Sequence, residues 1–448
     1  MTTSVADLSE VALAAARAAG ADAADVIVVD GTSTSIDVRD SVLEQVERSE
    51  GVDIGLRVLV GQRQASVSIS DNRPEAITRM AERAVAMANE APEDPHAGLA
   101  TPDQLARDLD SARLDLFDPS DEPSAAELEE TARTAEAAAR AVAGVTRIDS
   151  ASAAYGRRSI HLAASNGFSA GYTRSDRSHS CVAIAGEGTG MERDYDFDHR
   201  VYQSDLRDPT EVGRIAGERA VERLSPGKPA TGTYPVLFDE RIASSLIGHL
   251  LQAINGAMIA RGSSWLRDAM GTAVLPDGID LIEQPHRPRV TGSRLFDAEG
   301  LPTSERAIVK DGVLTGWTLD LATARKLGLD STANAARGTG GPPSPSVSNV
   351  ALTQGSASRA DLLAQMGTGL LVTSMIGSTI NPNTGDYSRG ASGFWIEGGE
   401  VTGPVSEITV AGNLTDMLRR IVPANDARPH LSRVVPSLLI DGLTLAGS

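Results

Sequence analysis

The clearest pattern in the sequence is the stretch Val52-Asp53-Ile54-Gly55-Leu56-Arg57-Val58-Leu59-Val60-Gly61-Gln62-Arg63-Gln64-Ala65-Ser66-Val67-Ser68-Ile69-Ser70. Apolar side chains occupy alternate positions from Val52 to Val60, and again from Ala65 to Ile69, where serines stand between them. Such alternation is typical of a strand with one buried face, and Gly61-Gln62 supplies the turn of a hairpin. The stretch therefore predicts an antiparallel sheet with one face in solvent.

The residues on either side extend this sheet and add a helix. Residues 33–40 and 42–47 form a second predicted hairpin, which turns at Asp40-Ser41. Downstream, Asn72 is the predicted N-cap of a helix, with Glu75 at the capping-box position and an apolar stripe over residues 77–88. A helix with such a stripe packs on one face of a sheet, so an α+β domain is predicted here.

Shifts in composition mark the predicted domain boundaries. Residues 91–124 are rich in Pro and Asp, which indicates a linker-like segment on the surface. The cluster Ser225-Pro226-Gly227-Lys228-Pro229 follows a predicted helix and precedes a predicted strand. We therefore expect an N-terminal α+β domain over residues 1–225, and a C-terminal, hairpin-rich, mainly β domain with a few helices over 226–448. Lys310-Asp311-Gly312 and Glu397-Gly398-Gly399-Glu400 are predicted tight turns of the second domain.

Charge and hydropathy exclude several classes of function. The chain has 448 residues, and 60 Asp and Glu against 41 Lys and Arg give a formal net charge of −19. This sign repels phosphate backbones and anionic membrane surfaces, so we expect no direct contact with nucleic acid or membranes. No apolar run approaches the ~18 residues of a membrane span. The start, Met1 to Asp7, lacks the basic region of a signal peptide, so a cytoplasmic protein is expected.

The sequence offers few metal ligands. Cys181 is the only cysteine, which excludes an internal disulfide and a zinc site built on several thiolates. None of the seven histidines is followed by Glu, so the chain has no H-E-x-x-H helix. A predicted helix over residues 239–258 has Asp239 as its N-cap and carries Ser244, Ser245 and His249 on its polar face. Spacing alone leaves open whether this polar strip faces solvent or serves a function.

Four blocks in the second half carry a resemblance to a known family. They are residues 296–303 (Phe-Asp-Ala-Glu-Gly-Leu-Pro-Thr), 308–314 (Ile-Val-Lys-Asp-Gly-Val-Leu), 381–397 (Asn-Pro-Asn-Thr-Gly-Asp-Tyr-Ser-Arg-Gly-Ala-Ser-Gly-Phe-Trp-Ile-Glu) and 436–443 (Pro-Ser-Leu-Leu-Ile-Asp-Gly-Leu). These blocks resemble the PmbA/TldE branch of the TldD/TldE metalloprotease family, also called peptidase U62 or modulator of DNA gyrase. The first half agrees with that family in the order of its elements.

The resemblance implies that this chain is the partner without a metal site. Active TldD-type subunits hold a metal with an H-E-x-x-x-H helix and a late cysteine. In the corresponding helix of this chain, Ser244 and Ser245 replace the first His and the Glu, only His249 remains, and no thiol follows Cys181. The resemblance therefore implies no catalytic residue, metal or cofactor in this chain, and a metal in a TldD-type catalytic subunit. The pair is expected to degrade or process short, unstructured polypeptides, and the chain alone to be inactive.

Two segments are candidate peptide-lining loops. They are residues 338–345, which fit no regular element and contain Gly340 and Gly341, and residues 381–389, which contain Asn381, Asn383 and Arg389. Plain structural loops explain both segments equally well.

The assembly and activity of the chain alone leave alternatives open. We expect a homodimer when the chain is alone. One alternative is a self-sufficient homodimeric peptidase with a non-standard site built from residues such as His430, Asp416 or His249. Another is a peptide-binding adaptor without any protease context.

Overall fold

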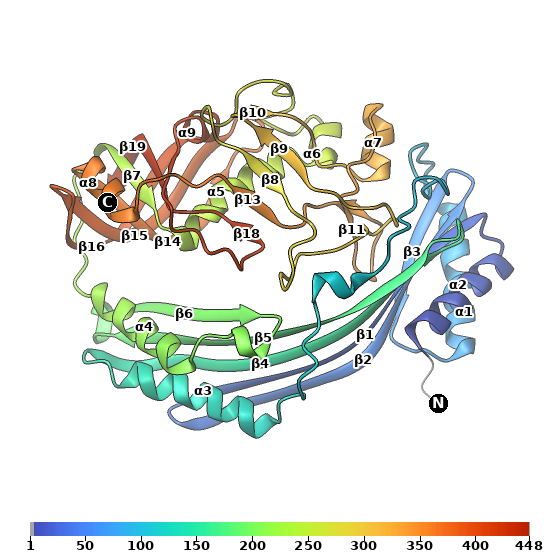
Figure 1. Ribbon diagram of the computed structural model, residues 1–448, viewed down its shortest axis with the longest axis horizontal. Helices are drawn as coiled ribbons and strands as arrows, with labels where there is room; N and C mark the ends of the chain where they lie inside the picture. The colour runs from blue at the N-terminus through green and yellow to red at the C-terminus, as the bar shows by residue number, and fades with distance from the viewer. Residues whose placement is uncertain (1–3, 448) are drawn as a thin grey trace.

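The computed structural model describes residues 4–447, and its N-terminal half is built on one long, curved antiparallel sheet (Figure 1). The six strands lie in the order β3-β2-β1-β4-β5-β6. Their bounds are β1 (Ala23–Arg39), β2 (Val42–Val60), β3 (Arg63–Ile69), β4 (Val145–Ala164), β5 (Ser169–Ala185) and β6 (Glu192–Arg200). The hairpin predicted over residues 52–70 is formed by β2 and β3, which confirms that prediction.

The hairpin predicted to turn at Asp40-Ser41 joins β1 and β2. Both turn residues have positive φ, 52° and 59°, as a tight two-residue turn requires. β1 is longer than the strand predicted over residues 33–40, because it begins at Ala23 and Gly31 continues it. Gly31 pairs with Gly51 on one side and Arg158 on the other, so neighbouring strands supply the hydrogen bonds that hold it extended.

Four helices cover one face of this sheet, and the C-terminal half lies over the other face (Figure 1). Val26 and Val28 of β1 pack against the first pair of helices, and Ile36 and Val38 pack against α3. These four residues have the same parity along β1, so they point to the same face. The helices are α1 (Val5–Ala18), α2 (Pro74–Glu90), α3 (Ala125–Arg140) and α4 (Pro209–Glu222).

Helix α2 begins one residue later than predicted. Its N-cap is Arg73, whose side chain makes no capping hydrogen bond, and Pro74 occupies the first helical position. Asn72 is therefore not the cap. The fixed φ of proline and its missing N–H suit the first helical position, so Pro74 sets the start of the helix.

Residues 91–124 run between the two halves and are packed against both. Leu114, in a short 3-10 helix (Ser111–Leu114), and Leu116 are buried with Phe296 of the C-terminal half. The Ala106 N–H donates to the Gly300 carbonyl at 2.9 Å. The segment therefore contacts both halves through a few buried side chains.

The C-terminal half contains two larger sheets. One has the order β10-β9-β8-β13-β18, and the other has the order β16-β15-β14-β7-β19-β17 and closes on itself because β16 also pairs with β19. The strands are β7 (Gly232–Phe238), β8 (Leu281–Glu283), β9 (Arg306–Lys310), β10 (Val313–Leu314), β11 (Ala335–Ala336), β12 (Ser344–Pro345), β13 (Val350–Leu352), β14 (Gly369–Ile380), β15 (Asp386–Glu397), β16 (Glu400–Asn413), β17 (Val422–Pro423), β18 (Arg433–Val434) and β19 (Leu438–Gly447). The helices are α5 (Glu240–Ala253), α6 (Gly256–Ala260), α7 (Leu321–Leu327), α8 (Arg359–Met366) and α9 (Leu414–Leu418).

The predicted turns of this half are confirmed. Asp311 and Gly312 join β9 to β10 with φ of 48° and 76°, and Gly398 and Gly399 join β15 to β16 with φ of 60° and 84°. The α+β class, with an antiparallel sheet first and a β-rich second half, is confirmed as well. Among residues 4–447, none of the helices is both long and apolar enough to cross a membrane.

Candidate functional site

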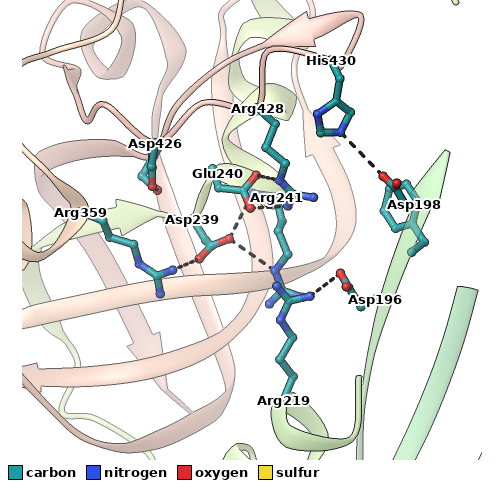
Figure 2. A network of polar contacts seen from close by, with 12 residues as sticks. Asp196, Asp198, Arg219, Asp239, Glu240, Arg241, Arg359, Asp426, Arg428 and His430 are labelled. Carbon is teal, nitrogen blue, oxygen red and sulfur yellow. Dashed lines mark hydrogen bonds and ion pairs between the residues drawn. The ribbon is translucent and has the colours of Figure 1, made fainter. Parts of the chain in front are cut away.

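Helix α5 is the element that the resemblance identifies as the counterpart of a metal-binding helix. It follows β7 directly, and its N-cap is Asp239, as predicted: the carboxylate accepts the Arg241 N–H at 3.1 Å. Arg359 of α8 pairs with the same carboxylate at 2.9 Å (Figure 2). The helix ends at Ala253 and not near residue 258, because Asn255 caps the separate helix α6. The buried face carries Ala243, Leu246, Ile247, Leu250 and Leu251.

The first turn of α5 is anchored to both halves of the molecule. The Arg241 guanidinium contacts Asp194 of β6 at 2.9 Å. Arg428, in the segment before β18, donates to the Glu240 carboxylate at 2.8 Å (Figure 2). Arg241 is largely buried, so these contacts are charge-assisted hydrogen bonds with little solvent screening. They fix the position of the helix between the sheet of the first half and the core of the second.

The polar face of α5 holds two buried groups that lack a partner. Among residues 4–447, neither the Ser245 hydroxyl nor the His249 Nε2 atom finds a hydrogen bond, although both atoms are shielded from solvent. The His249 ring meets the buried Tyr387 ring edge-on, with centroids 6.1 Å apart. Burial lowers the pKa of His249 to about 4, and the positive charges of Arg389 and Arg433 act in the same direction. The imidazole is therefore neutral at physiological pH.

Two guanidinium groups lie near this imidazole. Arg433 of β18 reaches over Gly248, and its Nη1 atom would be only 3.0 Å from a Cβ at that position. Arg389 of β15 donates from Nε to the Gly377 carbonyl at 2.7 Å. The absence of a side chain at Gly248 thus leaves room for the Arg433 guanidinium near His249.

These residues do not fit a metal ion. A catalytic zinc site needs three nitrogen, sulfur or carboxylate ligands, whereas Ser244 and Ser245 offer hydroxyl groups and His249 a single imidazole. Within residues 4–447, no group of three or more His, Cys, Asp or Glu side chains is placed to hold a metal. Cys181 is buried in β5, and burial raises the pKa of its thiol to about 12. The neighbouring guanidiniums add a positive field that opposes a cation.

A cavity of about 290 Å³ opens beside His249. Ile380 and Pro382, which flank Asn381, form part of its wall together with Trp265. The structure thus brings His249 and one of the two predicted peptide-lining segments together.

Within this segment, the predicted residues separate into a turn and a strand. The Asn381 side chain accepts the Asn383 N–H at 3.0 Å and stabilises the turn between β14 and β15, and Asn383 is exposed. Arg389 is not in the loop, which corrects the expectation. It lies in β15 and pairs with Val410 of β16. The neighbouring Tyr387 is buried in the core and also pairs with β16, so the strand has already begun before Arg389.

The second predicted segment, residues 338–345, packs elsewhere. Thr339 lies on Gly55 of β2, where a Cβ would be 2.3 Å from the Thr339 oxygen. A Cβ added at Gly340 or Gly341 would meet no atom of the described chain within 4 Å, so both glycines border open space. The expectation that this segment fits no regular element is wrong at its end. Ser344–Pro345 forms β12, which pairs with β11.

The alternative site residues are not joined by contacts. His430 approaches Asp198 of β6 at 3.9 Å (Figure 2), and burial lowers the pKa of His430 to about 4. Asp416 lies in α9, where its backbone carbonyl accepts from Arg420. In the described part of the chain, no hydrogen bond or ion pair links either residue to His249.

Sequence reasoning missed a buried cluster of charges between the halves. Asp25 of β1 accepts from Arg57 of β2 at 2.8 Å and pairs with Arg337, which follows β11. The side chains of all three are almost fully buried. Burial raises the pKa of Asp25, but the two guanidiniums outweigh this effect and hold the pKa below 3.8. The sequence feature that could have revealed this cluster is that Asp25 and Arg57 are charged residues within otherwise apolar strands.

The turn formed by the block at residues 296–303 lies against this cluster. The Asp297 carboxylate accepts the N–H groups of Glu299, Leu301 and Ala335 at 2.9 to 3.0 Å. The Glu299 carboxylate accepts the Leu321 N–H at the start of α7 at 2.8 Å. Burial and the nearby Asp297 carboxylate raise the pKa of Glu299 above its ordinary value. Through these hydrogen bonds the block connects β11 and α7, and the Gly300 carbonyl joins it to residue Ala106.

Comparisons with known proteins cover nearly the whole chain. Models of the PmbA/TldA metallopeptidases match as domain 1 at residues 24–88, the central domain at 118–224 and the C-terminal domain at 231–447. Metalloprotease PmbA of Escherichia coli O157:H7 is 39% identical over 95% of this chain and 92% of its own length.

Two crystal structures share the fold. A protein from Bacteroides thetaiotaomicron, described as a candidate modulator of DNA gyrase, is 27% identical with a TM-score of 0.90 over 98% of both chains. TldE from Thermococcus kodakarensis has a TM-score of 0.84 at 20% identity, over 98% of this chain and 100% of its own, and shows the same fold. The chain therefore belongs to the PmbA/TldE branch of the TldD/TldE metalloprotease family.

Proposed function

We propose that this chain is the non-catalytic, TldE-type subunit of a TldD/TldE peptidase, and that a TldD-type subunit supplies the metal and the bond cleavage. The observation that carries the proposal is the polar face of α5. Hydroxyls at Ser244 and Ser245 and an imidazole flanked by Arg389 and Arg433 stand where metal ligands would be needed. The metalloprotease name of the Escherichia coli relative supports a role in proteolysis.

The first half offers two features that an extended polypeptide could use. β3 pairs with β2 only from Ile54 to Val60, and no strand among residues 4–447 pairs with the outer edge of β2 from Val42 to Asp53. This edge is exposed, and its free N–H and C=O groups can accept an additional strand. A cavity of about 350 Å³, lined by Gly31, Gly51 and Arg158 among others, lies on the sheet face toward the C-terminal half. These features support a role in holding unfolded peptides.

The test is reconstitution with a TldD-type subunit. We expect the chain alone to hold no stoichiometric metal and to cleave no unstructured peptide, and the mixture to form a heteromer that cleaves peptides until a chelator is added. Metal content by mass spectrometry, light scattering and peptide cleavage followed by chromatography give the three readouts. Chelator-sensitive cleavage by the chain alone contradicts the proposal and supports the self-sufficient peptidase. Capture of intact peptides without any effect on the TldD-type subunit supports the adaptor.

Assembly and location belong to the same proposal. The chain alone forms a homodimer, and the heteromer acts in the cytoplasm. Light scattering at micromolar concentration tests the first statement, since a monomer there contradicts it. Fractionation of cells that express the tagged protein tests the second.

A further inference from the structure

The cavity beside His249 has two unlike walls. Met258, Trp265, Ile380 and Pro382 give it an apolar side, and His249 and Gln252 of α5 give it a polar side. Its volume of about 290 Å³ is at the lower end of ligand pockets, which begin near ~300 Å³. A ligand that fills it needs a small apolar group and a polar group a few bonds apart.

The charge beside the cavity is positive, in contrast to the chain's net charge of −19. Arg433 reaches Gly248, the residue before His249, and Arg389 stands two residues after Tyr387, whose ring meets the His249 ring. Among residues 4–447, neither guanidinium has an ion pair with a carboxylate, whereas Arg428 and Arg241 at the first turn of α5 both do. These two cations do not line the cavity themselves, but they lie near His249, which does, and unneutralised positive charge there favours an anionic ligand.

Helix α5 also has unused hydrogen-bonding groups here: His249 lines the cavity, and Ser245 lies one helical turn before it. His249 Nε2 and Ser245 Oγ are buried without a partner in the described chain, and such groups are rare because burial without a bond is unfavourable. A neutral imidazole can donate one N–H, and a hydroxyl can donate one O–H, to the same anion.

We propose that this cavity binds the carboxy-terminal residue of a peptide, with its α-carboxylate beside His249, Arg389 and Arg433 and its side chain against Trp265 and Met258. A peptide C-terminus joins one carboxylate to one apolar side chain on the same carbon, as a ligand of this cavity requires. A phosphate leaves the apolar wall unused, and a metal cation meets the field of the two arginines. The inference rests on the proposed role in peptide handling and specifies which end of the peptide this subunit holds.

The binding test uses the full chain alone and a pair of acetylated peptides. Acetyl-Ala-Ala-Ala-Leu with a free carboxylate is compared with the same peptide as a C-terminal amide, by calorimetry and by tryptophan fluorescence. We expect the free acid to bind at least about tenfold more tightly, because charge-assisted hydrogen bonds are lost in the amide. Trp265→Phe should remove the fluorescence change, since Trp265 lines the cavity. Equal binding of acid and amide overturns the proposal.

Variants separate this site from a general charge effect. Arg433→Gln should weaken binding of the free acid about tenfold and leave binding of the amide unchanged. Arg214→Gln is the matched control, because Arg214 is an exposed arginine on α4 in the other half, paired with Glu218. Ile380→Asp adds a like charge to the wall and should abolish binding of the acid. If Arg433→Gln and Arg214→Gln bind the acid alike, with unchanged circular dichroism, the carboxylate is not held here.

Failure of the cavity proposal can be distinguished from failure of the proposed function. If the acid fails to bind but the chain still activates a TldD-type subunit, only the cavity proposal is wrong. If the acid binds as expected and no TldD-type subunit is activated, the proposed function is wrong and the cavity serves an adaptor.

Discussion

Replacing Asp25 by Asn should destabilise the protein strongly, because this carboxylate neutralises two buried guanidiniums. Arg57 and Arg337 both contact Asp25, and none of the three side chains is more than 4% exposed. Removing one partner of a buried ion pair costs about 3–5 kcal/mol, since the remaining charge stays out of water without compensation. Here two cations lose their partner, so the upper part of that range is expected.

The loss should be measured as the free energy of unfolding by urea, followed by circular dichroism. A loss of about 4 kcal/mol changes the unfolding equilibrium constant by roughly 10³. Glu218→Gln is the control, because it breaks an exposed pair with Arg214 on α4 and should change the free energy of unfolding by less than about 1 kcal/mol. Arg337 also donates to the Gly55 carbonyl, so residues 335–341 should exchange amide hydrogens faster in Asp25→Asn.

The pH dependence gives an independent check. The pKa of Asp25 is lowered in the folded state, so its contribution to stability is present above pH 3.8 and is lost as the pH falls through the folded pKa. The difference between wild type and Asp25→Asn should therefore shrink at acid pH. If the two proteins unfold within about 1 kcal/mol of each other at pH 7, the buried-charge argument is refuted.

Three further changes test other parts of the structure. In wild type, the free energy of unfolding should fall as the pH rises from 4.5 toward the raised pKa of folded Glu299, because the folded state keeps a proton that the unfolded state releases. Glu299→Gln should remove this fall. Urea midpoints of both proteins between about pH 5 and 8 measure the effect, and identical pH profiles contradict it. Ser244→His combined with Ser245→Glu should still bind no stoichiometric zinc, because the thiol ligand is missing and the arginine field remains; mass spectrometry after dialysis against zinc decides it. Gly55→Ala should lower the free energy of unfolding by about 1–3 kcal/mol, since its Cβ would meet the Thr339 backbone. That Cβ would lie 2.3 Å from the Thr339 oxygen, so an unchanged urea midpoint would show that the 338–341 loop moves freely.

Local patterns were enough to predict many individual elements. The alternation in β2 and β3, the Asp40-Ser41 turn and the Asp239 cap all depend on residues close together in the sequence. The predicted start of α2 was wrong by one residue, because Pro74 takes the first helical position and makes Arg73, not Asn72, the N-cap. The strand predicted to begin at residue 33 begins at Ala23, because pairing with strands on both sides keeps Gly31 extended despite its weak local preference.

By itself, the sequence determined which chemical groups α5 can present: hydroxyls at Ser244 and Ser245, one imidazole at His249, and no thiol later in the chain. The family resemblance implies that these groups replace a metal-binding triad, and the absence of a metal stays a prediction. Only the tertiary structure decided what surrounds them. Arg389 and Arg433 come near His249 from the separate strands β15 and β18, and Arg337 meets Asp25 across 312 residues of sequence. Such contacts depend on how whole sheets pack, and packing brings together charges that no local pattern relates.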